Sequence, residues 1–172
     1  DLNQTLNQMI GSRNQDVQVR AIRLVGLWKA DALVGPIKAM VNTEALPATV
    51  RSEAIESLGQ LIGQQANDEA IEAILDPASE IRQAALRTLC ELDLSKAAQL
   101  ANGLLREALS DEAIHSVVTP FLGHREGLHA LANALGNAPV DPNLATRIRG
   151  LLGSVGRYNP VLDQILRAAE NN

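Results

Sequence analysis

Apolar residues recur along this chain in stripes that have the spacing of an α-helix. In the first stripe, Val17, Ala21 and Val25 lie four residues apart, and the small residue Gly26 follows directly. Side chains four positions apart share one face of a helix. The pattern returns at intervals of 33, 31, 33 and 30 residues, so that the five stripes begin at Val17, Val50, Ile81, Ile114 and Leu144. This periodicity predicts a row of similar helices in which the small residues let a neighbouring helix approach closely.

A second, shorter amphipathic stretch follows each of these stripes. The second stretches begin at Leu33, Ala70, Leu100, Leu128 and Val161, and the third of them extends to Leu109. Each repeat is therefore expected to consist of a helix, a short turn and another helix. One such pair cannot bury its own apolar stripe, so neighbouring repeats must stack to form a continuous core.

Several residue pairs mark the expected helix starts. An Asp or Asn side chain can accept the first backbone N–H groups of a helix, and proline fits the first helical turn. Such pairs occur at Asp76-Pro77, Asp141-Pro142 and Asn159-Pro160, and Ser95 and Asn67 are further candidates for the N-cap position. Pro120 falls inside the fourth stripe and should shorten or kink that helix.

Composition supports the helical interpretation and narrows the function. Hydrophobic residues make up 46% of the chain but aromatic residues only 2%, whereas strand-rich domains use aromatic side chains heavily. The net charge of −5 disfavours nucleic acid as a partner, because binding phosphates needs a basic surface. Cys90 is the single cysteine, which excludes an internal disulfide and a cysteine-based metal cluster. No apolar run approaches the roughly 20 residues that span a bilayer.

The candidate chemical motifs each have a simpler structural interpretation. His124 and His129 flank Glu126, but they are five residues apart, whereas two metal ligands on one helix face need a spacing of four. We therefore favour surface histidines and expect neither a metal nor a cofactor. The glycines of the segment 150–156 lack the spacing and the preceding strand of a phosphate-binding loop, so close helix packing is preferred, with Gly156 ending a helix. No combination of Ser, His and Asp residues has a spacing that suggests a catalytic Ser-His-Asp grouping.

Two further side chains are expected to be structural. Cys90 takes the place that Gly26 and Gly59 occupy in their stripes, which favours a buried, inert thiol over a reactive one. Trp28 follows the first stripe, and filling the core is a simpler role for it than forming a binding hot spot.

The repeats resemble HEAT repeats, in a short form that also occurs in phycobilin lyase subunits. The residues that carry the resemblance are Val50-Arg51, Ala54 and Leu58-Gly59, and then Asp76-Pro77, Ile81-Arg82, Ala85 and Leu89. The resemblance implies an all-α fold, a right-handed α-solenoid of about five helical hairpins preceded by one helix. It also implies that Arg51 and Arg82 form a structural ladder, pairing with acidic residues of the adjacent repeat. The candidate partners are Asp16, Glu53 and Glu80.

The spacing of the repeats predicts one repeat domain over the whole chain. Residues 1–11 would be a helix of a preceding repeat, and the repeats would cover 12–45, 46–76, 77–109, 110–138 and 139–172. Because the chain opens at Asp1 in a helical pattern and without an initiator Met, we expect it to be a piece of a longer polypeptide.

The resemblance also points to a partner-binding surface. In HEAT-type solenoids the second helices line the concave side, so their polar positions are the candidates for contacting a partner. Helical spacing selects Glu69, Glu72, Gln99, Asn102, Arg106, His129, Asn133 and Arg167, with Glu126 and Asp163 beside them. The surface is mixed in charge and more acidic towards its start.

The leading hypothesis is a non-catalytic interaction or spacer module whose partner is a protein or a flanking domain of the same polypeptide. The alternative is a HEAT-like enzyme of the bilin lyase or DNA glycosylase type, although a glycosylase needs a basic face with stacking aromatics. Residues 121–160 are also similar to the helical array of large bacterial proteins in which a β-propeller precedes the array and a c-type haem domain follows it. That similarity implies an extracytoplasmic location, with redox chemistry in other domains, since this chain has no Cys-x-x-Cys-His motif.

Overall fold

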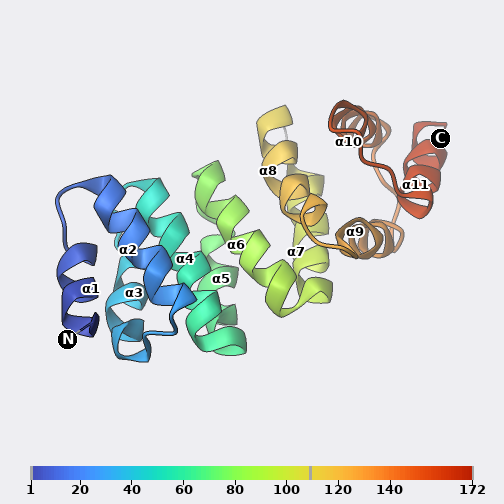
Figure 1. Ribbon diagram of the computed structural model, residues 1–172. Coiled ribbons are helices and arrows are strands. Elements are labelled where there is room, and N and C mark those ends of the chain that lie inside the picture. Colours follow the sequence, from blue (N-terminus) through green and yellow to red (C-terminus); the bar gives the residue numbers. More distant parts are fainter. Residues whose placement is uncertain (1, 109, 172) are drawn as a thin grey trace. The chain divides into compact units, whose positions relative to one another are not determined.

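The computed structural model describes residues 2–108 and 110–171, and this part of the chain is helical without any strand (Figure 1). The prediction of an all-α fold built from helical pairs is confirmed. The helices form two compact units, Asp1–Leu92 and Asp93–Asn172, and each unit has its own core. Leu109, which ends the third of the second stretches, lies outside the described residues.

The first unit contains three of the predicted stripes on neighbouring helices. α2 packs on α4, and α4 packs on α6. The central residues of the stripes, Ala21, Ala54 and Ala85, are each fully buried between these helices. The elements of this unit are α1 (Leu2–Ile10), α2 (Gln15–Leu27), η1 (Asp31–Leu33), α3 (Val34–Val41), α4 (Ala48–Ile62), η2 (Gly63–Ala66), α5 (Asn67–Ala73) and α6 (Ser79–Leu92).

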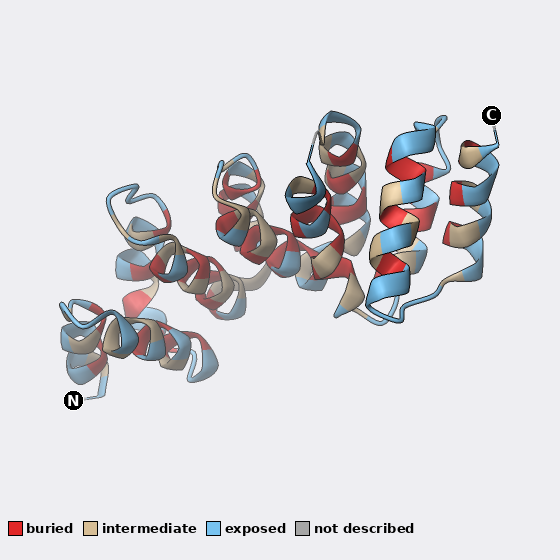
Figure 2. Ribbon diagram, turned by 90° about the horizontal axis from the view of Figure 1, so that it is seen from above, coloured by how far each residue is buried: buried red, intermediate tan, exposed pale blue. Residues whose placement is uncertain are grey.

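The second unit contains the remaining stripes. α8 packs on α10, while α9 lies between α7 and α11 and contacts both. Phe121 at the end of α8 is fully buried, as are Leu131 of α9 and Ile148 of α10, so the apolar faces meet inside the unit (Figure 2). The helices are α7 (Leu94–Glu107), α8 (Asp111–Leu122), α9 (Gly127–Leu135), α10 (Pro142–Ser154) and α11 (Pro160–Glu170).

The predicted helix starts at Asp141 and Asn159 are confirmed. The Asp141 carboxylate accepts the Leu144 amide of α10 at 3.0 Å, and the Asn159 side chain accepts the Leu162 amide of α11 at 2.9 Å. Asp76 accepts the Ala78 amide at 2.9 Å in a turn just ahead of α6, which begins at Ser79.

The other two cap candidates were wrong. The N-cap of α7 is Asp93, which accepts the Lys96 amide at 3.0 Å, and Ser95 lies inside the first turn. Asn67 is the first residue of α5, and its side-chain amide donates to Gln64 Oε1 at 2.8 Å. Each chosen residue stands one or more positions too late to reach the free amides of the first turn.

Pro120 lies in the last turn of α8, which ends two residues later at Leu122. With 12 residues α8 is shorter than α4 with 15 or α6 with 14, as expected from a proline in the fourth stripe.

Two glycines allow the helices of the first unit to approach closely. A Cβ at Gly26 would lie 2.9 Å from Ser57 Oγ, and one at Gly59 would lie 2.5 Å from Thr88 Cγ2. The Ser57 hydroxyl donates to the Ile22 carbonyl at 2.9 Å across the same contact. The expectation fails in the second unit, where no described atom of a neighbouring helix lies within 4 Å of a Cβ at Gly123 or Gly153.

Gly127 has a different packing role. A Cβ at this position would lie 2.1 Å from the Phe121 carbonyl oxygen, so the start of α9 rests directly on the backbone at the end of α8. Glycine thus sets the distance between these two helices.

We predict that Gly127→Ala destabilises the protein by about 1–3 kcal/mol, because the added methyl must displace backbone atoms. Gly103→Ala is the matched control in α7, since nothing described lies within 4 Å of its Cβ position. The control should stabilise by about 0.5–1 kcal/mol through helix propensity alone. Urea denaturation of both variants measures the difference, and equal behaviour would contradict the close contact.

Candidate functional site

One repeat position forms a ladder in the first unit. The residue after the first apolar position of each stripe donates to a backbone carbonyl at the end of the preceding helix or in the turn after it. Gln18 Nε2 donates to the Ile10 carbonyl at 2.8 Å, Arg51 Nε to the Val41 carbonyl at 3.1 Å, and Arg82 Nη2 to the Asp76 carbonyl at 3.1 Å. Carbonyls at a helix end lack partners within the helix, so each donor links one hairpin to the element before it.

The acidic partner of this ladder differs from the three candidates. Arg51 pairs with Asp76 at 2.9 Å, and both side chains are largely buried. Glu53 instead pairs with Arg23 of α2 at 2.7 Å. Glu80 accepts hydrogen bonds from Thr49 and Ser52, each at 3.5 Å, and Asp16 is exposed near the start of α2. For Arg51 the prediction of these acidic partners was therefore wrong, because Asp76 in the turn before α6 faces α4.

Glu69 is not available to a partner. Its side chain is only 10% exposed and forms an ion pair with Lys38 of α3. The hydrogen bond from Lys38 lowers the pKa of the Glu69 carboxyl and outweighs its partial desolvation. The sequence spacing placed Glu69 on an open polar face, but the long Lys38 side chain covers it. Glu72, one turn further along α5, is exposed.

Three of the predicted contact residues are used within the second unit. Arg106 donates to the Pro139 carbonyl at 2.8 Å and the Ala138 carbonyl at 3.3 Å, and its Nε donates to Asn102 Oδ1 at 3.1 Å. These bonds hold the segment between α9 and α10 against the end of α7. Arg167 donates from Nε to Asp163 Oδ2 at 2.7 Å within α11.

The other three line one groove between α7 and α9. Gln99 comes from α7, and His129 and Asn133 come from α9, where successive turns place them on one face. The groove has a volume of about 490 Å³. Its further lining residues are Leu94, Ser95, Ala98, Glu126, Ala130, Ala134 and Asn137. Side chains of Gln99, His129 and Asn133 form no hydrogen bond with any described residue, so their donors and acceptors face solvent.

The lining of this groove combines small apolar residues with polar ones. Ala98, Ala130 and Ala134 are small, which leaves room between α7 and α9 for an inserted side chain or a short segment. The amides and the imidazole can both donate and accept hydrogen bonds. This arrangement is suited to binding the backbone and polar side chains of a protein segment. The sequence did not indicate that these alanines line a groove, because small residues on a helix are equally consistent with a buried contact between helices.

The histidine pair is separated by the start of α9. His124 lies in the turn, where its Nδ1 accepts the Glu126 amide at 3.3 Å, and His129 lies on the helix. Among the described residues no group of three or more His, Cys, Asp or Glu side chains is arranged to hold a metal ion.

Cys90 is buried in α6, as its place in the stripe predicted. Burial raises the pKa of its thiol to about 12, so it is protonated at neutral pH.

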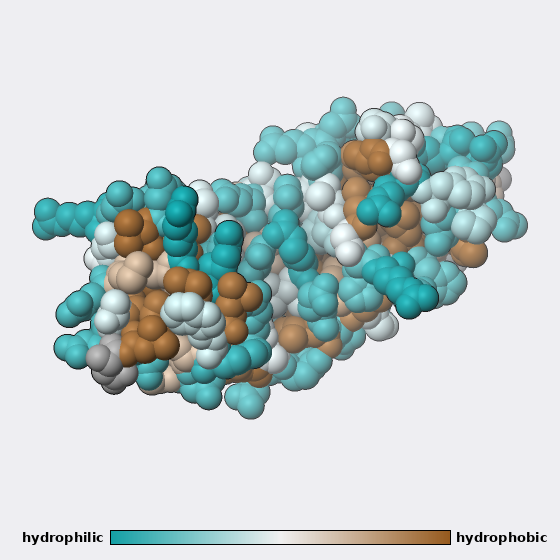
Figure 3. All heavy atoms as spheres, viewed as in Figure 1, coloured by the Kyte–Doolittle hydropathy of each residue, from teal (hydrophilic) through white to brown (hydrophobic). Residues whose placement is uncertain are grey.

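The assignment of Trp28 to the core was wrong, since its side chain is 52% exposed. α2 ends at Leu27, and Lys29 turns the chain with a φ of 52°. Hydrophobic surface gathers over α1, α2 and α3 in Figure 3.

Helical hairpins, repeated stripes and the carbonyl ladder define an α-helical repeat protein. A family model described as HEAT repeats matches residues 2–89 and 43–119. The chain therefore belongs to the HEAT-repeat family. A search of the curated proteins found no match.

A solved structure shows the same fold. The complex of CpcE and CpcF of phycocyanin lyase from Nostoc sp. PCC7120 is similar to this chain with a TM-score of 0.52 and 18% sequence identity. The similarity covers 95% of this chain and 74% of that one. None of the helices within residues 2–108 and 110–171 has the length and hydropathy needed to cross a bilayer.

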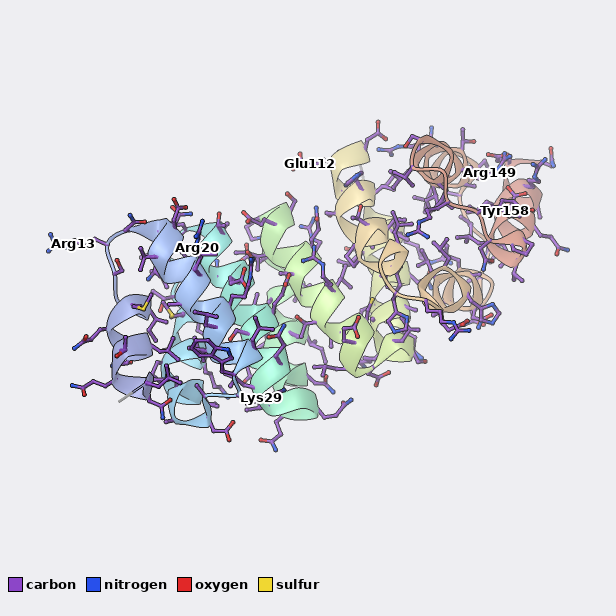
Figure 4. The ribbon with its side chains drawn as sticks, in the orientation of Figure 1. Arg13, Arg20, Lys29, Glu112, Arg149 and Tyr158 are labelled. Atoms are coloured by element: carbon purple, nitrogen blue, oxygen red, sulfur yellow. The ribbon has the colours of Figure 1, made fainter. Side chains whose placement is uncertain are left out.

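We predict that Arg51→Met lowers the free energy of unfolding by about 1.5–3 kcal/mol, because it removes the cation paired with Asp76 and leaves the Val41 carbonyl without its side-chain donor. Arg20→Met is the control on α2, since Arg20 is exposed and has no side-chain partner among the described residues (Figure 4). The control should stay within about 0.5 kcal/mol of the unsubstituted chain. Chemical denaturation tests the ladder, and equal losses would refute it.

We predict that Cys90 resists alkylation in the folded protein. With a pKa of about 12, the reactive thiolate at pH 8 is about one part in ten thousand of the thiol, and burial also blocks the reagent. Iodoacetamide followed by mass spectrometry should label Cys90 fully in denaturant and very slowly without it. Rapid labelling of the folded chain would show that the thiol is accessible.

Proposed function

We propose that this chain is a non-catalytic interaction module and that the groove between α7 and α9 binds a segment of a partner protein or of a flanking domain. The observation that carries the proposal is the free hydrogen-bonding capacity of Gln99, His129 and Asn133 in one groove. Repeat proteins commonly use such extended surfaces to bind partners. Membership of the HEAT-repeat family supports the same class of function.

The contrast with the rest of the predicted surface supports this choice. Glu69, Arg106 and Arg167 form ion pairs or hydrogen bonds within the chain, so a partner would have to break these before using them. The groove residues require no such exchange. Their polar groups lose only water on binding, and an incoming segment can replace that water with direct hydrogen bonds.

A bilin-handling function is the second candidate, since the similar solved structure contains subunits of a phycocyanin lyase. A linear tetrapyrrole has two carboxylates and a row of pyrrole nitrogens. The groove offers His129 and amide donors for such groups, and its volume of about 490 Å³ lies within the range of small-molecule sites. Absorbance titration with a bilin distinguishes this candidate from the scaffold.

We predict that a photo-crosslinking amino acid at position 129 captures a specific protein partner and that the same residue at position 112 does not. Glu112 of α8 is exposed and has no side-chain partner among the described residues, which makes it the matched control. The captured protein is identified by mass spectrometry and purified for calorimetric titration. Gln99→Ala, His129→Ala and Asn133→Ala together should weaken its affinity by about tenfold or more.

Unchanged affinity in the triple variant would exclude the groove as the binding surface. Saturable bilin binding that the triple variant abolishes would favour the second candidate over the scaffold. Circular dichroism checks that the triple variant stays folded, which is expected because all three side chains are exposed.

A further inference from the structure

Basic residues are concentrated at the end of the chain. Residues 142–172 contain four arginines and two acidic residues, whereas residues 1–141 contain eleven basic and eighteen acidic residues. The last helical pair, α10 and α11, therefore carries a local positive charge on an acidic protein. An acidic ligand is attracted to this part and repelled by most of the remainder.

The turn between α10 and α11 presents two side chains in a fixed arrangement. Gly156 has a φ of 63°, and the amides of Gly156 and Arg157 donate to the carbonyls of Gly153 and Leu152 at 3.2 and 2.9 Å. This pair of bonds is a Schellman motif, which closes a helix through a left-handed residue. Asn159 caps α11 immediately afterwards. Arg157 and Tyr158 thus lie between two capped helix ends, and little backbone freedom is lost when they bind a partner.

A network of arginines surrounds the carboxylate of Asp163. Arg149 donates from Nε to Asp163 Oδ1 at 3.1 Å and also pairs with Glu170, while Arg167 donates to Asp163 Oδ2. The pKa of the Asp163 carboxyl is lowered, chiefly by the hydrogen bond from Arg167. Both oxygens of Asp163 are therefore already engaged by cations.

Unused donors remain on this network. Arg167 uses only its Nε–H for Asp163, and its Nη hydrogens have no partner among the described residues. The Arg157 side chain has no hydrogen bond or ion pair with the described residues and is exposed. A guanidinium presents several N–H groups in a planar fork that fits a carboxylate.

The surface beside these donors is apolar and slightly hollow. Tyr158 is 72% exposed, and Val155 and Val161 are also exposed on either side of it in the sequence. A hollow of about 240 Å³ is lined by Arg149, Leu152, Gly153, Arg157, Tyr158, Asn159, Asp163, Leu166 and Arg167. Figure 4 shows Arg149 and Tyr158 at this helical pair.

We propose that this corner between α10 and α11 is a second interaction surface, which binds an acidic segment of a protein partner. A Glu or Asp side chain of the segment enters the hollow and accepts hydrogen bonds from Arg157 and Arg167. An adjacent apolar side chain of the segment packs on Tyr158 and the two valines. Arginine and tyrosine are among the residue types enriched at the hot spots of protein interfaces.

Size and charge favour a peptide carboxylate over a nucleic acid. The hollow is smaller than the roughly 300 Å³ at which small-molecule sites begin, so it fits one side chain. A polynucleotide needs a row of cations along its backbone. Here Arg157 and Arg167 do not form such a row, and the carboxylates of Asp163 and Glu170 stand close by.

The test uses the single tyrosine and the single tryptophan of the chain as reporters. Protein labelled with fluorotyrosine and fluorotryptophan gives one ¹⁹F resonance from Tyr158 and one from Trp28. We predict that a short peptide of glutamates with two leucines shifts the Tyr158 resonance in a saturable manner and leaves that of Trp28 unchanged. A lysine-containing peptide of the same length should shift neither resonance.

The charge-reversed variant Arg157→Glu should bind the acidic peptide with an affinity lower by about tenfold or more. Arg13→Glu changes the net charge by the same amount in the first unit, where Arg13 is exposed and has no side-chain partner among the described residues, and it should retain the affinity. Both substitutions leave the ion pairs of the fold intact, so both variants are expected to fold.

Equal loss of affinity in the two variants would show long-range attraction only and would overturn the proposal. A single-stranded oligonucleotide or inorganic phosphate that competes at lower concentration than the peptide would also overturn it. None of these substitutions touches the groove between α7 and α9, and the triple variant of that groove should bind the acidic peptide normally. Failure here is therefore distinguishable from failure of the proposed function.

Discussion

A single amphipathic helical pair in water leaves its apolar stripe exposed, so it must pack against a neighbouring pair to be stable. This need to bury the stripe governs the structure. In the first unit Ala21, Ala54 and Ala85 lie at the centre of the stripes and are buried only because α2, α4 and α6 lie side by side. Gly26 and Gly59 bring those helices closer than larger residues permit. Stability is therefore a property of neighbouring repeats and not of a single repeat.

The polar residues of this chain have two kinds of surroundings. Some long side chains connect the helices, as with Arg51 to Asp76, Arg23 to Glu53 and Arg106 to the segment before α10. Others have no side-chain partner among the described residues, and the α7–α9 groove and the α10–α11 corner each contain several of these. A residue's availability depends on what lies within reach of it, and residue type alone does not reveal this.

The regular helices could be predicted from sequence because their signals are local. The apolar stripes, the caps at Asp141 and Asn159 and the helix end at Gly156 each depend on residues within one or two turns. Glu69 and Glu72 show why the contacts could not be predicted: they are three residues apart on one helix, yet Lys38 covers the first and leaves the second open. Trp28 was misplaced for a related reason, since its exposure follows from a turn at Lys29 that no proline or glycine marks.

The ladder of Gln18, Arg51 and Arg82 has a consequence for how such a chain can change in length. Each donor belongs to one hairpin, and its acceptor is fixed a short distance upstream. Duplication of a complete hairpin would supply both a new donor and a new acceptor, and the row would continue without interruption. Insertion of one residue inside α4 ahead of Arg51 would rotate its side chain by about 100° around the helix, away from the Val41 carbonyl. The array can thus grow in whole repeats, while small insertions are confined to the turns outside these connections.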